Sequence, residues 1–295
     1  MLLTAVVIPL FSLALALAVL HLRVRAYRAR ARRPTIGFLH PYCNDGGGGE
    51  RVLWVAIREL VARGIVHPDT WRMVVYTGDR IPPAELRANA KHRFGIELPE
   101  SLEFVQLSCR GWIEPSRYPV ATLLGQALGS VLLAAEALLR APPDVLVDTT
   151  GLAYCYPLVR AAGVRHLACY VHYPIVQSDM LGAVASRQAA HNNAAFFARS
   201  AARSALKLAY YRLLLGCYAH AGSHAPSWWH HSSPPWPPGA GSPGSWPHYA
   251  LKTGPLGRRA AQGPQGGYGA AVRPGRGGRF CRICVSRLQA ATRTR

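Results

Sequence analysis

The residues of this chain best suited to hold an anion are a glycine run and the acidic residue that ends it: Gly46, Gly47, Gly48, Gly49 and Glu50. They follow a short apolar run, residues 35–42, which predicts a buried strand. From Glu50 onward apolar residues recur at helical spacing. A glycine loop between a strand and a helix presents backbone amides and a helix N-terminus, and both attract phosphate groups. No Lys-Ser or Lys-Thr follows, and Val52 stands where a dinucleotide fingerprint requires its third glycine, so a flexible connector remains the alternative.

Further polar residues follow later runs that also predict strands. Asp148 and Thr149 end a predicted strand at residues 144–149, and His172 and Tyr173 follow the next one. Because parallel strands end at the same edge of a sheet, we expect these side chains to lie beside the glycine loop. The predicted cleft-lining residues are Asp148, Thr149, Tyr173 and Asp179. From the residues alone, His172 could instead be a strand-end histidine that is satisfied by a neighbouring carbonyl.

The sequence does not predict a metal site. No Asp-x-Asp pair occurs, and Cys281-x-x-Cys284 has neither a second pair nor a histidine at zinc-finger spacing. The seven cysteines are scattered, which favours reduced thiols over a disulfide framework.

The elements that would position these residues alternate between strand and helix. Predicted strands at 35–42, 71–77, 102–107 and 144–149 are separated by predicted helices, which is typical of a doubly wound, Rossmann-like parallel sheet of the α/β class. Residues 118–135 carry no charge, and window hydropathy would assign them as a membrane span. We interpret them as a buried helix, because Gln126, Ser130 and two glycines interrupt the run and a strand follows directly.

The N-terminus predicts a membrane anchor. Residues 2–22 contain no charged side chain, and as a helix they would be about 30 Å long. A basic juxtamembrane segment, residues 23–34, follows and places its side of the membrane in the cytosol. The alternative, a cleaved secretory signal, would need a basic start and a small-residue cleavage site. Residues 196–218 form an apolar helix with basic residues at four-residue spacing, which indicates a helix at the membrane interface or an ordinary core helix.

Two longer strings resemble one family. HPYCNDGGGGERVLW at residues 40–54 and YVHYP at 170–174, followed by SDML, resemble the α-1,2-mannosyltransferases of the dolichol pathway. These are retaining enzymes of the two-domain GT-B type, and the resemblance covers residues 1–225. It implies transfer of mannose from GDP-mannose to the dolichyl-diphosphate-linked trimannosyl oligosaccharide, at the cytosolic face of the endoplasmic reticulum, in a single-pass protein without a further cofactor. It implies His172 at the reacting centre, the glycine loop and Glu50 at a diphosphate, and membrane lipids and related mannosyltransferases as partners.

The resemblance stops at residue 225. Residues 226–295 are rich in glycine and proline and contain no acid, so we expect a disordered basic tail, with the appearance of another reading frame. In GT-B enzymes the second domain carries a Glu-x7-Glu pair, and no acidic residue follows Asp179. We therefore expect the second domain to be missing. A non-catalytic, membrane-bound fragment that binds the acceptor or a partner is the alternative. An RNA-binding role rests only on RPGRGGR at 273–279, and nucleic acid is not an expected partner.

Overall fold

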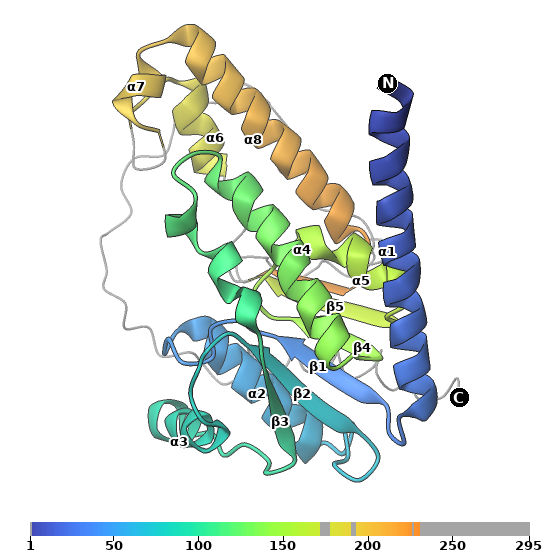
Figure 1. Cartoon of the computed structure of the whole chain (residues 1–295). Coiled ribbons are helices and arrows are strands. Elements are labelled where there is room, and N and C mark those ends of the chain that lie inside the picture. Colours follow the sequence, from blue (N-terminus) through green and yellow to red (C-terminus); the bar gives the residue numbers. More distant parts are fainter. Residues whose placement is uncertain (1, 172–177, 190–192, 226, 231–295) are drawn as a thin grey trace, which may run out of the picture.

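The computed structural model describes residues 2–171, 178–189, 193–225 and 227–230, and for residues 2–6, 178–179 and 227–230 it describes the backbone only. Within these residues the chain forms one parallel sheet with helices on both faces, and an N-terminal helix runs beside it (Figure 1). The predicted α/β class is confirmed.

Six parallel strands form the sheet in the order β3-β2-β1-β4-β5-β6. They are β1 (Thr35–Leu39), β2 (Arg72–Thr77), β3 (Leu102–Gln106), β4 (Val145–Asp148), β5 (His166–Val171) and β6 (Ser227–His230). The central strands β1 and β4 are buried along their whole length, so their sequences are continuous apolar runs rather than alternating ones. The order reverses between β1 and β4, and this is the topological switch point of a doubly wound sheet.

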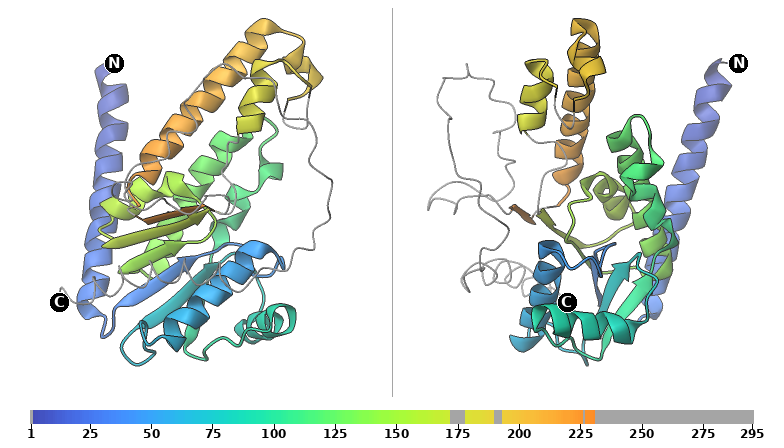
Figure 2. Two further views of the ribbon diagram at one scale, coloured as in Figure 1. Left: turned by 180° about the vertical axis from the view of Figure 1, so that it is seen from behind. Right: turned by 90° about the vertical axis from the view of Figure 1, so that its left-hand side faces the viewer.

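Alternate residues of the strands face two separate cores. Ile36 and Phe38 of β1 belong to the core that also holds Leu53 and Trp54 of α2 (Gly48–Ala62) and residues of α3 (Pro83–Phe94). Leu39 belongs to the other core, which also holds residues of α4 (Thr122–Arg140) and α5 (Tyr156–Ala161). Figure 2 shows these helix pairs on opposite faces of the sheet. Three short 3-10 helices, Ser108–Ile113, Pro115–Arg117 and Ala153–Cys155, connect the elements of the second face.

The N-terminal helix α1 (Leu2–Arg30) is longer than the predicted anchor and includes much of the predicted basic segment. Leu20 and Val24 are buried in the same core as α4. The Arg28 guanidinium donates to the carbonyls of Pro143 and Gly163. The lower part of α1 is therefore packed against the domain, while its first half carries exposed apolar side chains. Among the described residues, α1 and α4 are the two helices long and apolar enough to cross a membrane.

Helix α4 differs from the buried helix that we predicted. One side of it packs in the core, but Leu124, Leu128, Leu132 and Leu139 are exposed. The predicted helical segment at 196–218 is confirmed as two helices, α7 (Ala195–Ala198) and α8 (Ala201–Gly222), and α6 (Ser178–Ala185) precedes them.

The predicted start of the disordered tail also differs from the structure. Residues 227–230, Ser-Trp-Trp-His, pair with Ala168–Val171 of β5 as the edge strand β6. Aromatic residues favour strands, and the edge of β5 offers unpaired backbone groups, so local sequence and an available partner prevail over the composition of the segment as a whole. Residues 231–295 lie outside the described part of the chain.

Candidate functional site at the carboxyl edge of the sheet

Those predicted site residues whose side chains the structure describes lie where β1 and β4 end. The glycine loop follows β1, and residues 148–152 follow β4, its direct neighbour in the sheet. Helix α2 starts at Gly48, with Gly47 as its N-cap in an extended conformation. Ligands of doubly wound sheets bind at this crevice, outside the carboxyl ends of the strands.

The glycine loop is closed by the carboxylate of Glu50. Its Oε2 atom accepts hydrogen bonds from the amides of Gly46 and of Gly47, the latter at 3.0 Å. Gly46 has φ +78°, a left-handed conformation that favours glycine. Glu50 is buried, and burial raises its pKa, while the two loop amides oppose that shift. Two of the amides that we predicted to face a phosphate are thus bonded to a carboxylate of the same chain.

Space remains beside the loop. A Cβ placed on Gly47 would meet no atom within 4 Å, whereas one on Gly49 would lie 3.6 Å from the His40 ring. The open side of Gly47 is the position at which a ligand oxygen could approach the backbone most closely.

Helix α3 holds the other side of the loop, an arrangement that our sequence analysis missed. Asn89 Nδ2 donates to Asn44 Oδ1 at 2.9 Å, and Arg93 donates to the Asn44 carbonyl at 2.7 Å. Arg93 is exposed, and its guanidinium lies next to Gly46. The four-residue spacing of Asn89 and Arg93 on one helix face was the available signal, but only the fold shows what that face contacts.

A buried contact between His40 and Thr149 joins the two loops, and the sequence did not predict it. His40 Nδ1 lies 2.7 Å from Thr149 Oγ1, which in turn donates to the Leu39 carbonyl at 3.2 Å. The Thr149 hydroxyl has one proton, which can go to the Leu39 carbonyl or to His40 Nδ1, so the tautomer of His40 decides which of the two side chains donates in their bond. Burial lowers the pKa of His40 to about 4, so the ring is neutral at physiological pH. Thr149 is a link between β1 and β4.

Asp148 is fully buried and organises the loop after β4. Its carboxylate accepts from the amides of Thr150, Gly151 and Leu152 at 2.8, 3.1 and 2.5 Å. It also accepts from the hydroxyls of Thr150 and Tyr156, at 2.9 and 2.6 Å. Burial raises the pKa of Asp148, and these donors oppose the shift. Every one of these contacts lies within residues 148–156, so the buried carboxylate holds the loop that lines the predicted cleft.

Three of the predicted site residues have no described side chain. His172 and Tyr173 lie outside the described residues, and Asp179 belongs to α6 through its backbone only. Their roles stay predictions. Within the described residues, no group of three or more His, Cys, Asp and Glu side chains could hold a metal ion.

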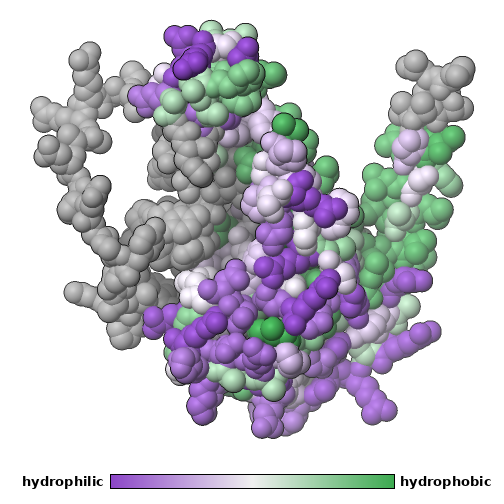
Figure 3. All heavy atoms as spheres, turned by 60° about the vertical axis from the view of Figure 1, so that its left-hand side comes forward, coloured by the Kyte–Doolittle hydropathy of each residue, from purple (hydrophilic) through white to green (hydrophobic). Residues whose placement is uncertain are grey.

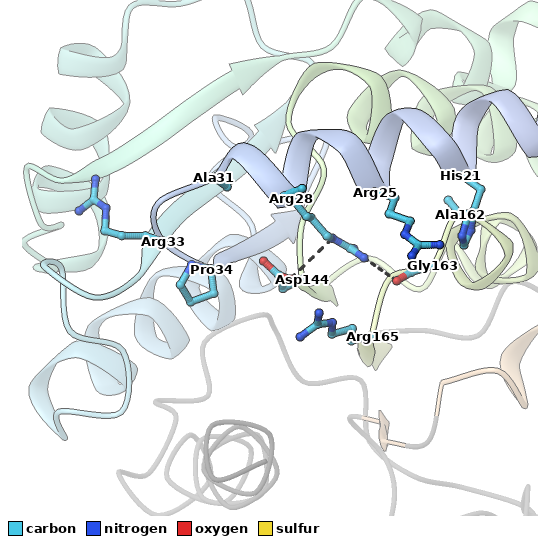
Figure 4. A pocket seen from close by; sticks show the side chains of 11 residues that line it. His21, Arg25, Arg28, Ala31, Arg33, Pro34, Asp144, Ala162, Gly163 and Arg165 are labelled. Atoms are coloured by element: carbon cyan, nitrogen blue, oxygen red, sulfur yellow. Dashed lines mark hydrogen bonds and ion pairs between the residues drawn. The ribbon is translucent and has the colours of Figure 1, made fainter. Parts of the chain in front are cut away.

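A basic pocket of about 430 Å³ lies at the opposite, amino edge of the sheet (Figure 4). It is lined by the C-terminal half of α1 and by Asp144, Gly163 and Arg165. Arg28 crosses it, with Nε 3.6 Å from Asp144 Oδ1 and Nη1 2.6 Å from the Gly163 carbonyl. Asp144 also accepts from the Thr35 amide at 2.9 Å. The pocket is thus the joint between α1 and the domain, remote from the glycine loop.

Comparison with known proteins places this geometry in a family. A model described as "ALG11 mannosyltransferase N-terminus" matches residues 33–234. The chain belongs to this family. The match includes β6, so the likeness extends beyond residue 225, where our sequence analysis ended it.

Curated relatives agree with the family. The chain is 43% identical over 237 residues to the Xenopus laevis protein named "GDP-Man:Man(3)GlcNAc(2)-PP-Dol alpha-1,2-mannosyltransferase", covering 75% of this chain and 48% of the relative. Mouse and human proteins of the same name are 46% and 44% identical over 189 residues, covering 64% of this chain and 38% of each relative. The chain thus spans about half the length, or less, of these relatives.

Proposed function

We propose that this chain takes part in α-1,2-mannosyl transfer from GDP-mannose to a dolichyl-diphosphate-linked oligosaccharide, as the N-terminal domain of a GT-B glycosyltransferase. The observation that carries the proposal is the family match, which covers the whole sheet and its glycine loop at the switch point. Both substrates contain a diphosphate, and a glycine loop at a helix N-terminus suits that group. His172 serves the reacting centre, and Tyr173 and Asp179 line the cleft.

The chemistry defines what the loop must do. Transfer breaks the bond between mannose C1 and the diphosphate oxygen of GDP and forms a bond between C1 and an acceptor hydroxyl oxygen. The diphosphate leaves with the negative charge and can take up the proton that the hydroxyl loses. Backbone amides that are fixed before the reaction stabilise such charge without reorganisation. The Asp148 contacts fix the shape of the loop after β4, and the His40–Thr149 contact ties that loop to the end of β1.

The acceptor is a lipid, and the membrane attachment of the chain fits it. In this proposal α1 spans the endoplasmic reticulum membrane, the domain faces the cytosol, and α8 lies at the interface. Support comes from the exposed apolar first half of α1 and from Lys207 on α8, which lies 4.7 Å from the Phe197 ring centroid. Such cation–aromatic pairs suit the boundary between lipid and water. Other mannosyltransferases of the pathway remain candidate partners.

The proposal is tested with the full chain in microsomes depleted of their own activity. Labelled GDP-mannose and a dolichyl-diphosphate trimannosyl acceptor are supplied, and lengthened oligosaccharide is measured. Gly47→Ala is the diagnostic variant, because the added methyl meets no protein atom yet occupies the open side of the loop. We expect it to lower transfer and acceptor binding several-fold.

The matched control is Gly111→Ala, which also adds a methyl group in open space, but on the 3-10 helix Ser108–Ile113. It should behave as the unaltered chain. If Gly47→Ala transfers mannose normally, the glycine loop does not bind the diphosphate. If the unaltered chain neither transfers mannose nor retains the acceptor, the proposed function is wrong.

A further inference from the structure

Helix α4 presents an exposed leucine stripe that no contact inside the described protein explains. Leu124, Leu128, Leu132 and Leu139 are between 43% and 61% exposed. Their spacing of four, four and seven residues places them on one side of the helix. On the other side, Leu133 and Ala137 are buried in the core. A water-facing helix surface normally carries charged or polar residues at such positions.

Exposed hydrophobic side chains are confined to three parts of the described chain. All the large ones lie on α1, on residues 112–139, or on α7 and α8. None lies between residues 35 and 111, where α2 and α3 carry charged surfaces. Figure 3 shows hydrophobic spheres along α1 and, mixed with hydrophilic ones, at the end that carries α7, while hydrophilic spheres predominate over the lower body. Helices α1 and α8 and the start of α4 project from the same end of the sheet (Figure 1).

The stripe is continuous with the predicted membrane anchor. Leu20 and Val24 of α1 are buried in the same core as Leu133 and Ala137 of α4, so the two helices pack together. Directly before Leu20, the exposed residues of α1 are apolar. A bilayer that surrounds α1 therefore comes next to α4.

The polar side chains of α4 are already satisfied inside the protein, as an apolar solvent requires. Gln126 donates to the Ile113 carbonyl at 2.9 Å, and Ser130 donates to the Ala127 carbonyl at 2.7 Å. Glu136 accepts from the amides of Ser108 and Cys109, both at 2.8 Å. These three polar side chains therefore need no water at the stripe.

The ends of the stripe carry groups that suit a lipid boundary. Before α4, the Arg117 guanidinium lies 3.9 Å from the Trp112 ring centroid, and the Tyr118 hydroxyl donates to the Trp112 carbonyl. At the other end, Arg140 is exposed and follows Leu139 directly. Arginine and aromatic residues that flank an apolar surface are typical of helices in contact with headgroups.

We propose that the Leu124–Leu128–Leu132–Leu139 stripe of α4 contacts the hydrocarbon of the bilayer, making α4 a membrane-embedded surface of the domain rather than a core helix or a second span. The inference rests on the proposed anchoring through α1. It gives the domain a second, lateral contact with lipid, between α1 and α8. The lipid-linked acceptor would then meet the domain along an apolar wall.

Site-specific photocrosslinking in liposomes tests the contact. Benzoylphenylalanine replaces Leu128 or Leu132 in the full chain, which is reconstituted in phosphatidylcholine and phosphatidylethanolamine that carry a clickable acyl chain. Leu13 on α1 is the positive control, and Arg58 and Glu85, exposed on α2 and α3, are the negative controls. We expect lipid adducts at the stripe that approach those at Leu13 and exceed those at the negative controls several-fold.

Each other result overturns the inference. A crosslink to a second copy, or to residues 231–295 of the same chain, would show that protein covers the stripe. Adducts at Leu13 but only background at Leu128 and Leu132 would refute the α4 contact and leave the α1 anchor intact. Background at Leu13 as well would instead refute the anchoring on which the inference rests.

A charge substitution adds a second measurement. With the crosslinker at Leu124, Leu128→Asp should reduce the lipid adduct several-fold, because a carboxylate is costly in hydrocarbon. Arg58→Asp, which places the same side chain on α2, should leave the adduct unchanged. Equal adduct yields in the two variants would contradict the proposal.

Discussion

The substitution Asp148→Asn tests whether the Asp148 carboxylate stabilises the loop after β4 or contacts a ligand. In the structure Asp148 Oδ1 accepts from the Thr150 amide and hydroxyl and from the Gly151 amide. Oδ2 accepts from the Leu152 amide and the Tyr156 hydroxyl. Asparagine has the same shape but replaces one acceptor oxygen by an NH2 donor.

The expected loss follows from those five bonds. The best orientation of the amide keeps its oxygen toward Thr150 and Gly151 and turns the NH2 group toward Leu152 and Tyr156. The tyrosine hydroxyl can rotate to accept, but the Leu152 amide then faces a donor. Losing one bond to a charged acceptor costs about 1.5–3 kcal/mol, and a buried unpaired amide adds about 1–3 kcal/mol. We expect about 3–5 kcal/mol of lost stability in total.

Hydrogen exchange measures this change where it occurs. The amides of Thr150, Gly151 and Leu152 should exchange faster by about two to three and a half decades, since about 1.4 kcal/mol corresponds to tenfold. Tyr156→Phe removes one of the five bonds and leaves the carboxylate and every backbone bond in place, so it should cost only that bond, about 1.5–3 kcal/mol. That variant is the matched control.

The reasoning fails if Asp148→Asn leaves exchange at residues 150–152 unchanged. If mannose transfer is nevertheless lost, the carboxylate acts on a ligand, as the prediction of a cleft-lining residue states. If both transfer and exchange are unchanged, neither role is correct.

Two further predictions concern the loops and the anchor. Burial lowers the pKa of His40 to about 4, so the contribution of the neutral ring to the free energy of unfolding should be fully present above about pH 6.5. The free energy of unfolding should then fall by about 3 kcal/mol as the pH drops toward 4. His40→Gln should flatten the pH dependence of thermal unfolding, whereas the control His92→Gln, at an exposed position, should not. Arg28→Ala removes the hydrogen bonds to the carbonyls of Pro143 and Gly163, so amide hydrogen exchange in the second half of α1 should become about tenfold faster or more. The chain should still float with liposomes. Unchanged exchange would show that the packing of Leu20 and Val24 is enough to hold α1 against the domain.

The strands and the glycine loop could be predicted because their signals are local. Buried parallel strands require continuous apolar runs, as in Thr35–Leu39, and four glycines before a helical pattern define a loop. The His40–Thr149 bond could not be predicted in the same way. Its partners are 109 residues apart and meet only because β1 and β4 are neighbours.

The differences at α4 and β6 have physical reasons too. Hydropathy averages over all sides of a helix, so a charge-free segment looks the same whether its outer leucines face protein or another apolar medium. Burial of Leu133 and exposure of Leu132, adjacent in sequence, distinguish the sides. At β6, a segment composition dominated by glycine and proline concealed two adjacent tryptophans, which favour a strand and pair at the edge of β5.

Glu50 leads to the last prediction, because any phosphate at the glycine loop must approach its carboxylate. Two unit charges about 5 Å apart repel by about 3 kcal/mol at an effective dielectric of about 20. The buried carboxylate already has a raised pKa, and an incoming diphosphate raises it further, so binding should take up a proton and strengthen as the pH falls. Glu50→Gln keeps an acceptor for Gly47 but removes the charge. It should bind GDP-mannose or the diphosphate lipid more tightly than the unaltered chain and with little dependence on pH, at a cost of about 1 kcal/mol in helix capping. Equal affinity and equal pH dependence in the two proteins would mean that Glu50 only caps α2 and that the ligand's charge lies elsewhere.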